Sequence, residues 1–80
     1  MHNIYEIAPS MRVLIILHNI SAINAKSAKR IDELRKICCL NENELCFAIR
    51  ELLAQGYICE CEGAYYLNSL GISVVRSIYT

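Results

Sequence analysis

The chain has 80 residues, which is enough for one domain. A chain this short buries only about 60% of its unfolded surface, so small domains depend on a staple or on a partner subunit. A hydrophobic content of 55% with only 20% charged residues excludes a disordered protein. The formal net charge of zero argues against tight non-specific binding of nucleic acid, but it leaves room for a local basic patch.

No targeting or membrane segment is evident. The apolar run from Met11 to Leu17 is shorter than the roughly 20 residues that a membrane-spanning helix needs. No charged leader precedes this run, and no small-residue cleavage site follows it. We therefore expect an intracellular, cytoplasmic protein without a membrane partner.

The first predicted helix covers residues 8–25 and follows an arm at residues 1–7. Pro9 suits the first turn of a helix. The run from Val13 to Leu17 leaves the middle of this helix without a polar face, and a helix that is apolar all round is buried all round. In so small a domain, we expect a second subunit to cover the far side, which predicts a homodimer.

A polar loop follows, and then a short helix. We expect Ile31 to form a very short strand against a later hairpin, and Asp32 to cap a helix over residues 32–39. Leu34, Ile37 and Cys38 would form the inner face of this helix. The loop before it carries the basic side chains Lys26, Lys29 and Arg30.

The most informative stretch runs from Asn41 to Gly56. Asn41 is predicted to cap a helix over residues 41–55, and Glu44, three residues on, completes a capping box. Gly56 suits the left-handed position that ends a helix. Helical spacing puts Leu45, Ala48, Ile49 and Leu52 on the buried face, and Asn43, Cys46, Phe47 and Arg50 on the outer face.

Residues 57–67 are predicted to form two short strands joined by a turn at Glu62-Gly63. Period two puts Cys59 and Cys61 on one face and Ile58 on the other, and the pattern leaves open which face is inside. Asn68 or Ser69 would cap a last helix over residues 68–79. Its predicted apolar stripe consists of Leu67, Leu70, Val74, Val75 and Ile78.

The five cysteines are an odd number, so at least one thiol is free or pairs with another chain. The usual cytosol keeps thiols reduced, whereas intracellular proteins of hyperthermophiles can be rich in disulfides. Abundant isoleucine and the absence of tryptophan fit a thermophile. The candidates for a disulfide are Cys39, Cys46, Cys59 and Cys61, with the connectivity open.

The sequence predicts neither an enzyme nor a bound cofactor. The cysteine spacing lacks the C-x₂-C pairs that structural zinc sites favour, so we expect no metal, and Cys38 is expected to pack as a small hydrophobic residue. His2 and His18 are the two histidines, and His18 lies in the apolar helix without an orienting partner at a fixed spacing. No glycine-rich phosphate loop occurs.

Several motifs together resemble the winged helix-turn-helix regulators of the MarR, ArsR and PadR kind. In those families a helix-turn-helix is followed by a "GLI"-like start of the wing and a "YxLT" return strand. The small size and the extra cysteines are similar to winged-helix proteins of archaeal viruses and plasmids, which act in the host cell. The matching residues are Ile31 to Leu34, Leu40-Asn41, Ile49, Leu52, Gly56 to Ile58 and Tyr65 to Asn68.

This resemblance implies an α+β, mainly α fold with a two-stranded wing and a C-terminal helix. It also implies a homodimer through the first and last helices. The function that the resemblance implies is sequence-specific binding of double-stranded DNA as a transcriptional regulator, with the helix over residues 41–55 in the major groove. The residues then expected at DNA are Lys29, Arg30, Asn41, Asn43, Cys46, Phe47 and Arg50.

The exposed residues depart from the usual regulator in their charge. The outer helix face is poor in Lys and Arg, and the expected wing tip from Glu60 to Gly63 carries carboxylates, which phosphates repel. A protein–protein module without DNA binding is therefore an alternative, with Phe47 and Leu53 meeting a partner. A regulator that senses redox state or metal through its cysteines is a third possibility.

Overall fold

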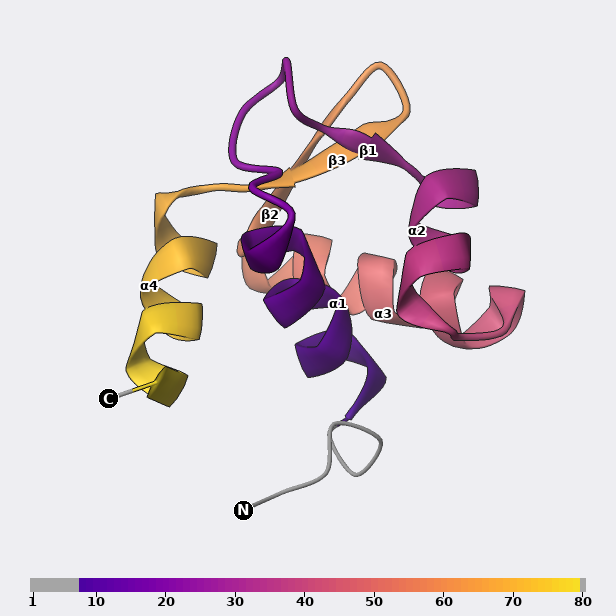
Figure 1. Ribbon diagram of the computed structural model, residues 1–80, viewed down its shortest axis with the longest axis horizontal. Helices are drawn as coiled ribbons and strands as arrows, with labels where there is room; N and C mark the ends of the chain where they lie inside the picture. The colour runs from indigo at the N-terminus through magenta and orange to yellow at the C-terminus, as the bar shows by residue number, and fades with distance from the viewer. Residues whose placement is uncertain (1–7, 80) are drawn as a thin grey trace.

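The computed structural model describes residues 8–79, which form a small, mainly helical α+β fold with one three-stranded antiparallel sheet (Figure 1). The arm expected at residues 1–7 lies outside this range. Within it, no helix has the length and apolar character needed to cross a bilayer. The elements are α1 (Pro9–Asn19), β1 (Lys29–Arg30), α2 (Ile31–Cys38), α3 (Glu42–Gln55), β2 (Ile58–Cys61), β3 (Ala64–Leu67) and α4 (Ser69–Tyr79).

Helix α1 lies at the centre of the core. In Figure 1 it runs in front of α3, with α2 on one side and α4 on the other, and it contacts all three helices and β3. Val13, Leu14 and Leu17 are fully buried in the single chain. The expected burial of this helix is therefore confirmed. The argument that a second subunit must bury its far side is wrong, because the other helices and β3 of the same chain bury it.

Helix α1 ends at Asn19, six residues before the expected bound at residue 25. Ser21 adopts a left-handed conformation with φ 58°. The Ala22 N–H donates to the Leu17 carbonyl at 2.9 Å, and the Ser21 N–H donates to the His18 carbonyl at 3.0 Å. This is a Schellman ending. The sequence did not indicate this helix end, because a serine occupies the left-handed position where glycine is the usual residue.

Strand β1 leads directly into α2. The short strand is Lys29–Arg30, just before the expected Ile31, and Ile31 already belongs to the helix. The expected cap at Asp32 is therefore wrong, since that residue lies in the first helical turn. The Arg30 N–H instead donates to the Glu33 carboxylate at 3.2 Å.

Helix α3 follows its predicted pattern closely. The Glu44 N–H donates to the Asn41 side-chain oxygen at 2.8 Å, and the Asn41 N–H donates to the Glu44 carboxylate at 3.3 Å, which completes the capping box. Gly56 ends the helix with φ 79°. The predicted stripe of Leu45, Ala48, Ile49 and Leu52 is buried, and the helix packs on α1.

The sheet has the strand order β1-β3-β2. Glu62 and Gly63 both have positive φ, of 52° and 82°, as a tight two-residue hairpin turn requires. Ile58 and Leu67 face each other across the hairpin and are buried. The side chains of Cys59 and Cys61 therefore lie on the opposite face of the sheet, which answers the question that the alternation left open.

Helix α4 is capped by Asn68, whose side-chain oxygen accepts from the Gly71 N–H at 2.9 Å. The Asn68 amide also donates to the Gly56 carbonyl at 2.7 Å, which ties the start of α4 to the end of α3. Val75 is fully buried as expected. Leu70 and Ile78, two members of the predicted apolar stripe, are exposed in the single chain.

Gly71 is buried where α4 meets the chain after α3. A Cβ there would overlap the Tyr57 carbonyl oxygen and lie 2.8 Å from the Leu67 side chain. We expect Gly71→Ala to lower the free energy of unfolding by about 1–3 kcal/mol through overpacking, despite a gain of about 1 kcal/mol in helix propensity. Urea unfolding followed by circular dichroism measures this. Ser73→Ala, at an exposed position of the same helix, is the control, and an unchanged Gly71→Ala midpoint would contradict the close contact.

Candidate nucleic-acid interface

The outer face of α3 is open to solvent because the opposite face of the helix packs on α1. Asn43, Phe47 and Arg50 follow one another at helical spacing on this face, and all three are exposed. Phe47 exposes 63% of its surface, more than any other large apolar side chain in the described part of the chain. Cys46 lies at the edge of the same face and is half-buried.

Asn41 has a structural role that limits its use as a reader of bases. Its side-chain oxygen already accepts the Glu44 N–H as the helix cap. A bidentate contact with adenine needs both the oxygen and the amide nitrogen of an asparagine. Asn43, which is exposed and lies in the first turn of α3, meets that requirement better.

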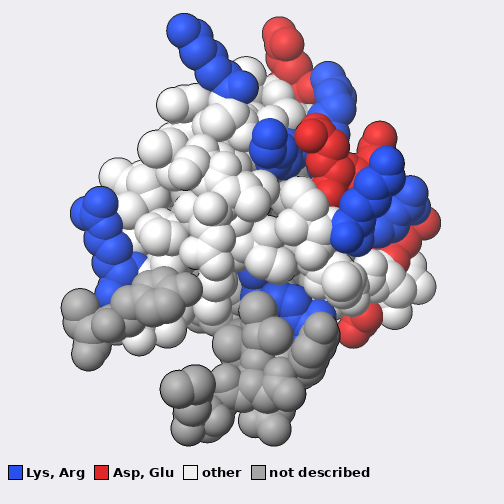
Figure 2. Space-filling model, viewed as in Figure 1, with Lys and Arg blue, Asp and Glu red and all other residues white. Residues whose placement is uncertain are grey.

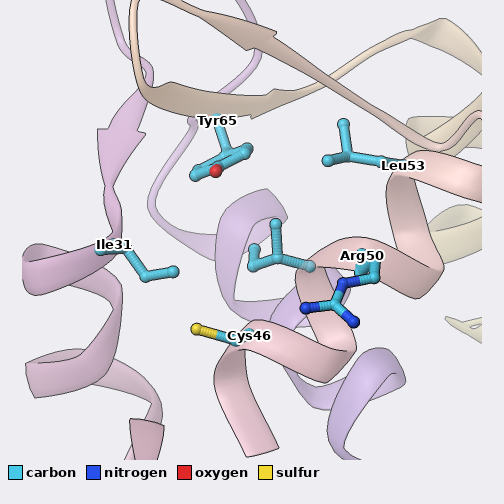
Figure 3. Close-up of a pocket in the computed structure, with 6 residues that line it drawn as sticks. Ile31, Cys46, Arg50, Leu53 and Tyr65 are labelled. Atoms are coloured by element: carbon cyan, nitrogen blue, oxygen red, sulfur yellow. The ribbon is translucent and has the colours of Figure 1, made fainter. Parts of the chain in front are cut away.

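A hollow of about 230 Å³ adjoins the outer face of α3 (Figure 3). In this view the Arg50 guanidinium and the Tyr65 hydroxyl lie around a mostly apolar wall, and the Cys46 thiol points toward Ile31. The hollow thus joins α3 to the start of α2 and to strand β3. Its lining residues are Ile31, Cys46, Ile49, Arg50, Leu53 and Tyr65.

A second hollow of about 240 Å³ lies on the other side of Arg50. It is lined by Phe47, Arg50, Glu51 and Ala54. Arg50 therefore forms a ridge between two mainly apolar hollows. The guanidinium can bond to a planar pair of acceptors or to an anion, while the hollows on either side can receive apolar groups.

The two basic residues of β1 lie on different faces of the sheet. Lys29 is opposite Tyr65, and Arg30 is opposite Ala64. Directly opposed side chains share a face, so Lys29 lies on the same side of the sheet as the tyrosine that lines the first hollow. The expected basic pair is thus divided, and Lys29 is the member nearer to the outer face of α3.

Arg30 brings a positive charge to the hairpin turn. A Cβ built on Gly63 would lie 3.1 Å from a guanidinium nitrogen of Arg30. This places Arg30 beside the turn that carries Glu62, where the sequence showed carboxylates without a basic neighbour. The repulsion expected between this turn and phosphates is therefore reduced.

The charges around the interface are mixed in sign. Figure 2 shows basic and acidic side chains interleaved on the side of the molecule where α2 lies. That helix has two acidic residues in its first turn, Asp32 and Glu33, and two basic residues in its last turn, Arg35 and Lys36. Burial and then the nearby Glu60 and Cys46 raise the pKa of the Tyr65 phenol above its ordinary value. The interface therefore offers hydrogen bonds and apolar contact more than a strong positive field.

Residue spacing alone identified the residues of the candidate interface that lie on one helix, α3. The expected members Asn43, Phe47 and Arg50 are together on α3. Tyr65 and Ile31 were treated only as fold markers, although they line the hollow. The packing of α2 on α3 and the pairing of β1 with β3 bring them beside the outer face of α3, so no local pattern could have shown their role.

The five cysteines are all free thiols, so the expected disulfide is absent from this fold. Cys59 and Cys61 point the same way along one strand, which holds their Cβ atoms further apart than the roughly 3.8 Å of a disulfide. Cys39 is exposed at the left-handed end of α2, whereas Cys46 lines the hollow. Across residues 8–79 no three His, Cys, Asp or Glu side chains gather as metal ligands would.

Comparison of the chain with protein-family models, with curated proteins and with solved structures finds no match. The geometry of α3 and its neighbours therefore carries the functional argument. The features that matter are the capped helix α3, its exposed outer face, and the hollow that α3 shares with α2 and β3.

Burial raises the pKa of the Cys38 thiol from its ordinary value of 9.0 to about 11, although Arg12 partly lowers it. The folded protein holds this proton more tightly than the unfolded chain. The free energy of unfolding should therefore fall as pH rises from about 9 to about 11. Urea unfolding at a series of pH values measures this. The decline should be smaller in Cys38→Ala and unchanged in Ser73→Ala, which removes no thiol, and equal declines in both variants would contradict it.

Proposed function

We propose that this chain is a winged helix-turn-helix protein that binds double-stranded DNA as a dimeric transcriptional regulator, with α3 in the major groove. The observation that carries this proposal is the outer face of α3, which exposes Asn43, Phe47 and Arg50 along a capped helix of 14 residues. The order of the elements and the hairpin between α3 and α4 support it, because they agree with the resemblance in the sequence.

Each side chain on this face has chemistry suited to a base edge. Arg50 can bond to the O6 and N7 atoms of guanine, and Asn43 can bond to the N6 and N7 atoms of adenine. Phe47 can contact the methyl group of thymine. Lys29 and Arg30, at the edge of the sheet, are suited to the phosphates on either side of the groove.

The proposed binding depends on few charges. Glu42 and Glu51 lie on the same helix as Arg50, and the net charge of the chain is zero. Each phosphate contact adds about 0.9 to the slope of log K against log salt. Affinity should therefore fall only moderately with salt, and base contacts should supply a large share of the specificity.

A protein partner is the second candidate for the same face. It is favoured by the 63% exposure of Phe47 and by the apolar character of both hollows beside Arg50. An aromatic side chain beside an arginine is a common centre of protein interfaces. On this alternative, Arg50 would pair with a carboxylate of the partner.

Selection of DNA sequences from a random duplex pool, followed by fluorescence anisotropy at 50 and 200 mM salt, tests the DNA proposal. We expect Arg50→Ala to weaken binding of the selected duplex by roughly 5–150-fold, since a bidentate base contact contributes about 1–3 kcal/mol. Lys29→Ala should weaken all duplexes alike and reduce the salt slope by roughly 0.9. Arg76→Ala on α4 is the matched control and should bind as the unmodified protein does.

Absence of binding at 50 mM salt by the folded protein would reject the DNA proposal and favour a protein partner. In that case Phe47→Ala should abolish capture of the partner while leaving the unfolding midpoint unchanged, because the side chain is largely exposed. An Arg50→Ala variant that still selected the same duplex would reject the proposed docking of α3.

A further inference from the structure

The first hollow beside α3 has the size and lining of a site for a small organic molecule (Figure 3). Its volume is about 230 Å³, and liquid water occupies about 30 Å³ per molecule, so it has room for about eight waters or one compact ligand. The buried Ile49 lies in it, with Ile31 and Leu53 as further apolar lining. A mostly apolar hollow with a few converging polar groups is the usual form of a small-ligand site.

Two polar groups at the edge of this hollow are available to a ligand. The Arg50 guanidinium comes from α3 and the Tyr65 hydroxyl from β3 (Figure 3). Within residues 8–79, neither group forms a hydrogen bond or an ion pair with another described residue. A guanidinium can only donate, and its parallel N–H groups match the two oxygens of a carboxylate. A ligand at this edge therefore needs acceptor oxygens.

The charges beside the hollow favour a ligand with a single negative charge. Lys29 lies opposite Tyr65 on β1, and Glu60 lies opposite Tyr65 on β2. Directly opposed side chains share a face, so these three residues form one row across the sheet. Arg50 and the half-buried Lys29 supply two positive charges, and Glu60 supplies one negative charge. These charges together attract a monoanion, whereas a second carboxylate on the ligand would be repelled by Glu60.

We propose that this hollow binds a small monocarboxylate with a compact aliphatic body. The carboxylate pairs with the Arg50 guanidinium and accepts a hydrogen bond from the Tyr65 hydroxyl. The aliphatic body lies against Ile31, Ile49 and Leu53. A neutral amide of the same shape keeps the apolar contact but loses the charge-assisted pair. Acetate keeps the pair but loses most of the apolar contact.

The consequence of this site for DNA binding rests on the proposed function. In that proposal the Arg50 guanidinium turns toward a guanine in the major groove, whereas a bound carboxylate holds the same group at the hollow. The monocarboxylate therefore competes with the duplex and releases the protein from its DNA. Binding of the ligand to the free protein depends on the hollow alone, so the two proposals can fail separately.

Titration of the full chain, followed by two-dimensional ¹H–¹⁵N NMR, tests the site with cyclohexanecarboxylate as the probe. Cyclohexanecarboxamide is its neutral match, and sodium acetate at equal concentration controls for ionic strength. The probe should shift the amide signals of α3 and β3 around the hollow and should saturate by about 10 mM. The carboxamide should bind at least about tenfold more weakly, because it lacks the charge. Acetate should not saturate the same signals.

Two variants each remove one polar group from the hollow. Arg50→Leu should weaken binding of the probe at least about tenfold, and Tyr65→Phe should weaken it at least about threefold. The matched controls are Arg76→Leu on α4 and Tyr66→Phe, which changes the opposite face of β3. Both controls should bind the probe as the unmodified protein does. The same spectra report whether each variant is folded.

The inference would be overturned by signals that move only elsewhere on the chain, by a carboxamide that binds as tightly as the carboxylate, or by an Arg50→Leu variant that keeps full affinity. A protein that selects a duplex but shows no saturable binding of the probe would contradict only this inference. A protein that binds the probe in the hollow but selects no duplex would contradict only the DNA proposal. Where both bind, the probe should raise the Kd of the selected duplex and acetate should not, and an unchanged Kd would contradict the competition.

Discussion

The packing of α3 on α1 determines the arrangement of the whole molecule. Leu45, Ala48, Ile49 and Leu52 enter the core together, and their helical spacing puts them on one side of α3. Once these residues face α1, the side that carries Asn43, Phe47 and Arg50 must face solvent. The capping box and the left-handed Gly56 set the two ends of the helix. The position of the candidate interface is therefore a consequence of core packing.

The interface combines apolar contact with a small number of directional polar groups. Arg50 stands between two hollows, and Tyr65 and Ile31 reach the first of them from other elements. Mixed charges nearby prevent a strong field of one sign. Such a surface would discriminate by shape and hydrogen bonding more than by attraction at a distance, which is the common basis of the DNA proposal and of the protein alternative.

The two exposed surfaces of the chain have different chemistry. The outer face of α3 contains an arginine and an asparagine, which can meet a polar ligand. On α4, Leu70 and Ile78 are exposed aliphatic side chains with small serines beside them. The outer face of α3 is therefore suited to a polar ligand, whereas Leu70 and Ile78 are suited only to apolar contact.

Local patterns were sufficient wherever one helix or one turn contained all the relevant atoms. The capping box at Asn41, the Glu62-Gly63 turn and the outer face of α3 follow from short-range spacing, because their geometry involves residues only a few positions apart. Contacts between distant segments decided the rest. The serine ending of α1, the cover around α1, the arrival of Tyr65 and Arg30 from the sheet, and the exposure of Leu70 and Ile78 all depend on which elements pack together. Residue spacing could assign each helix an apolar side. How much of that side is buried depends on the packing of the whole core, because only neighbouring elements can cover it.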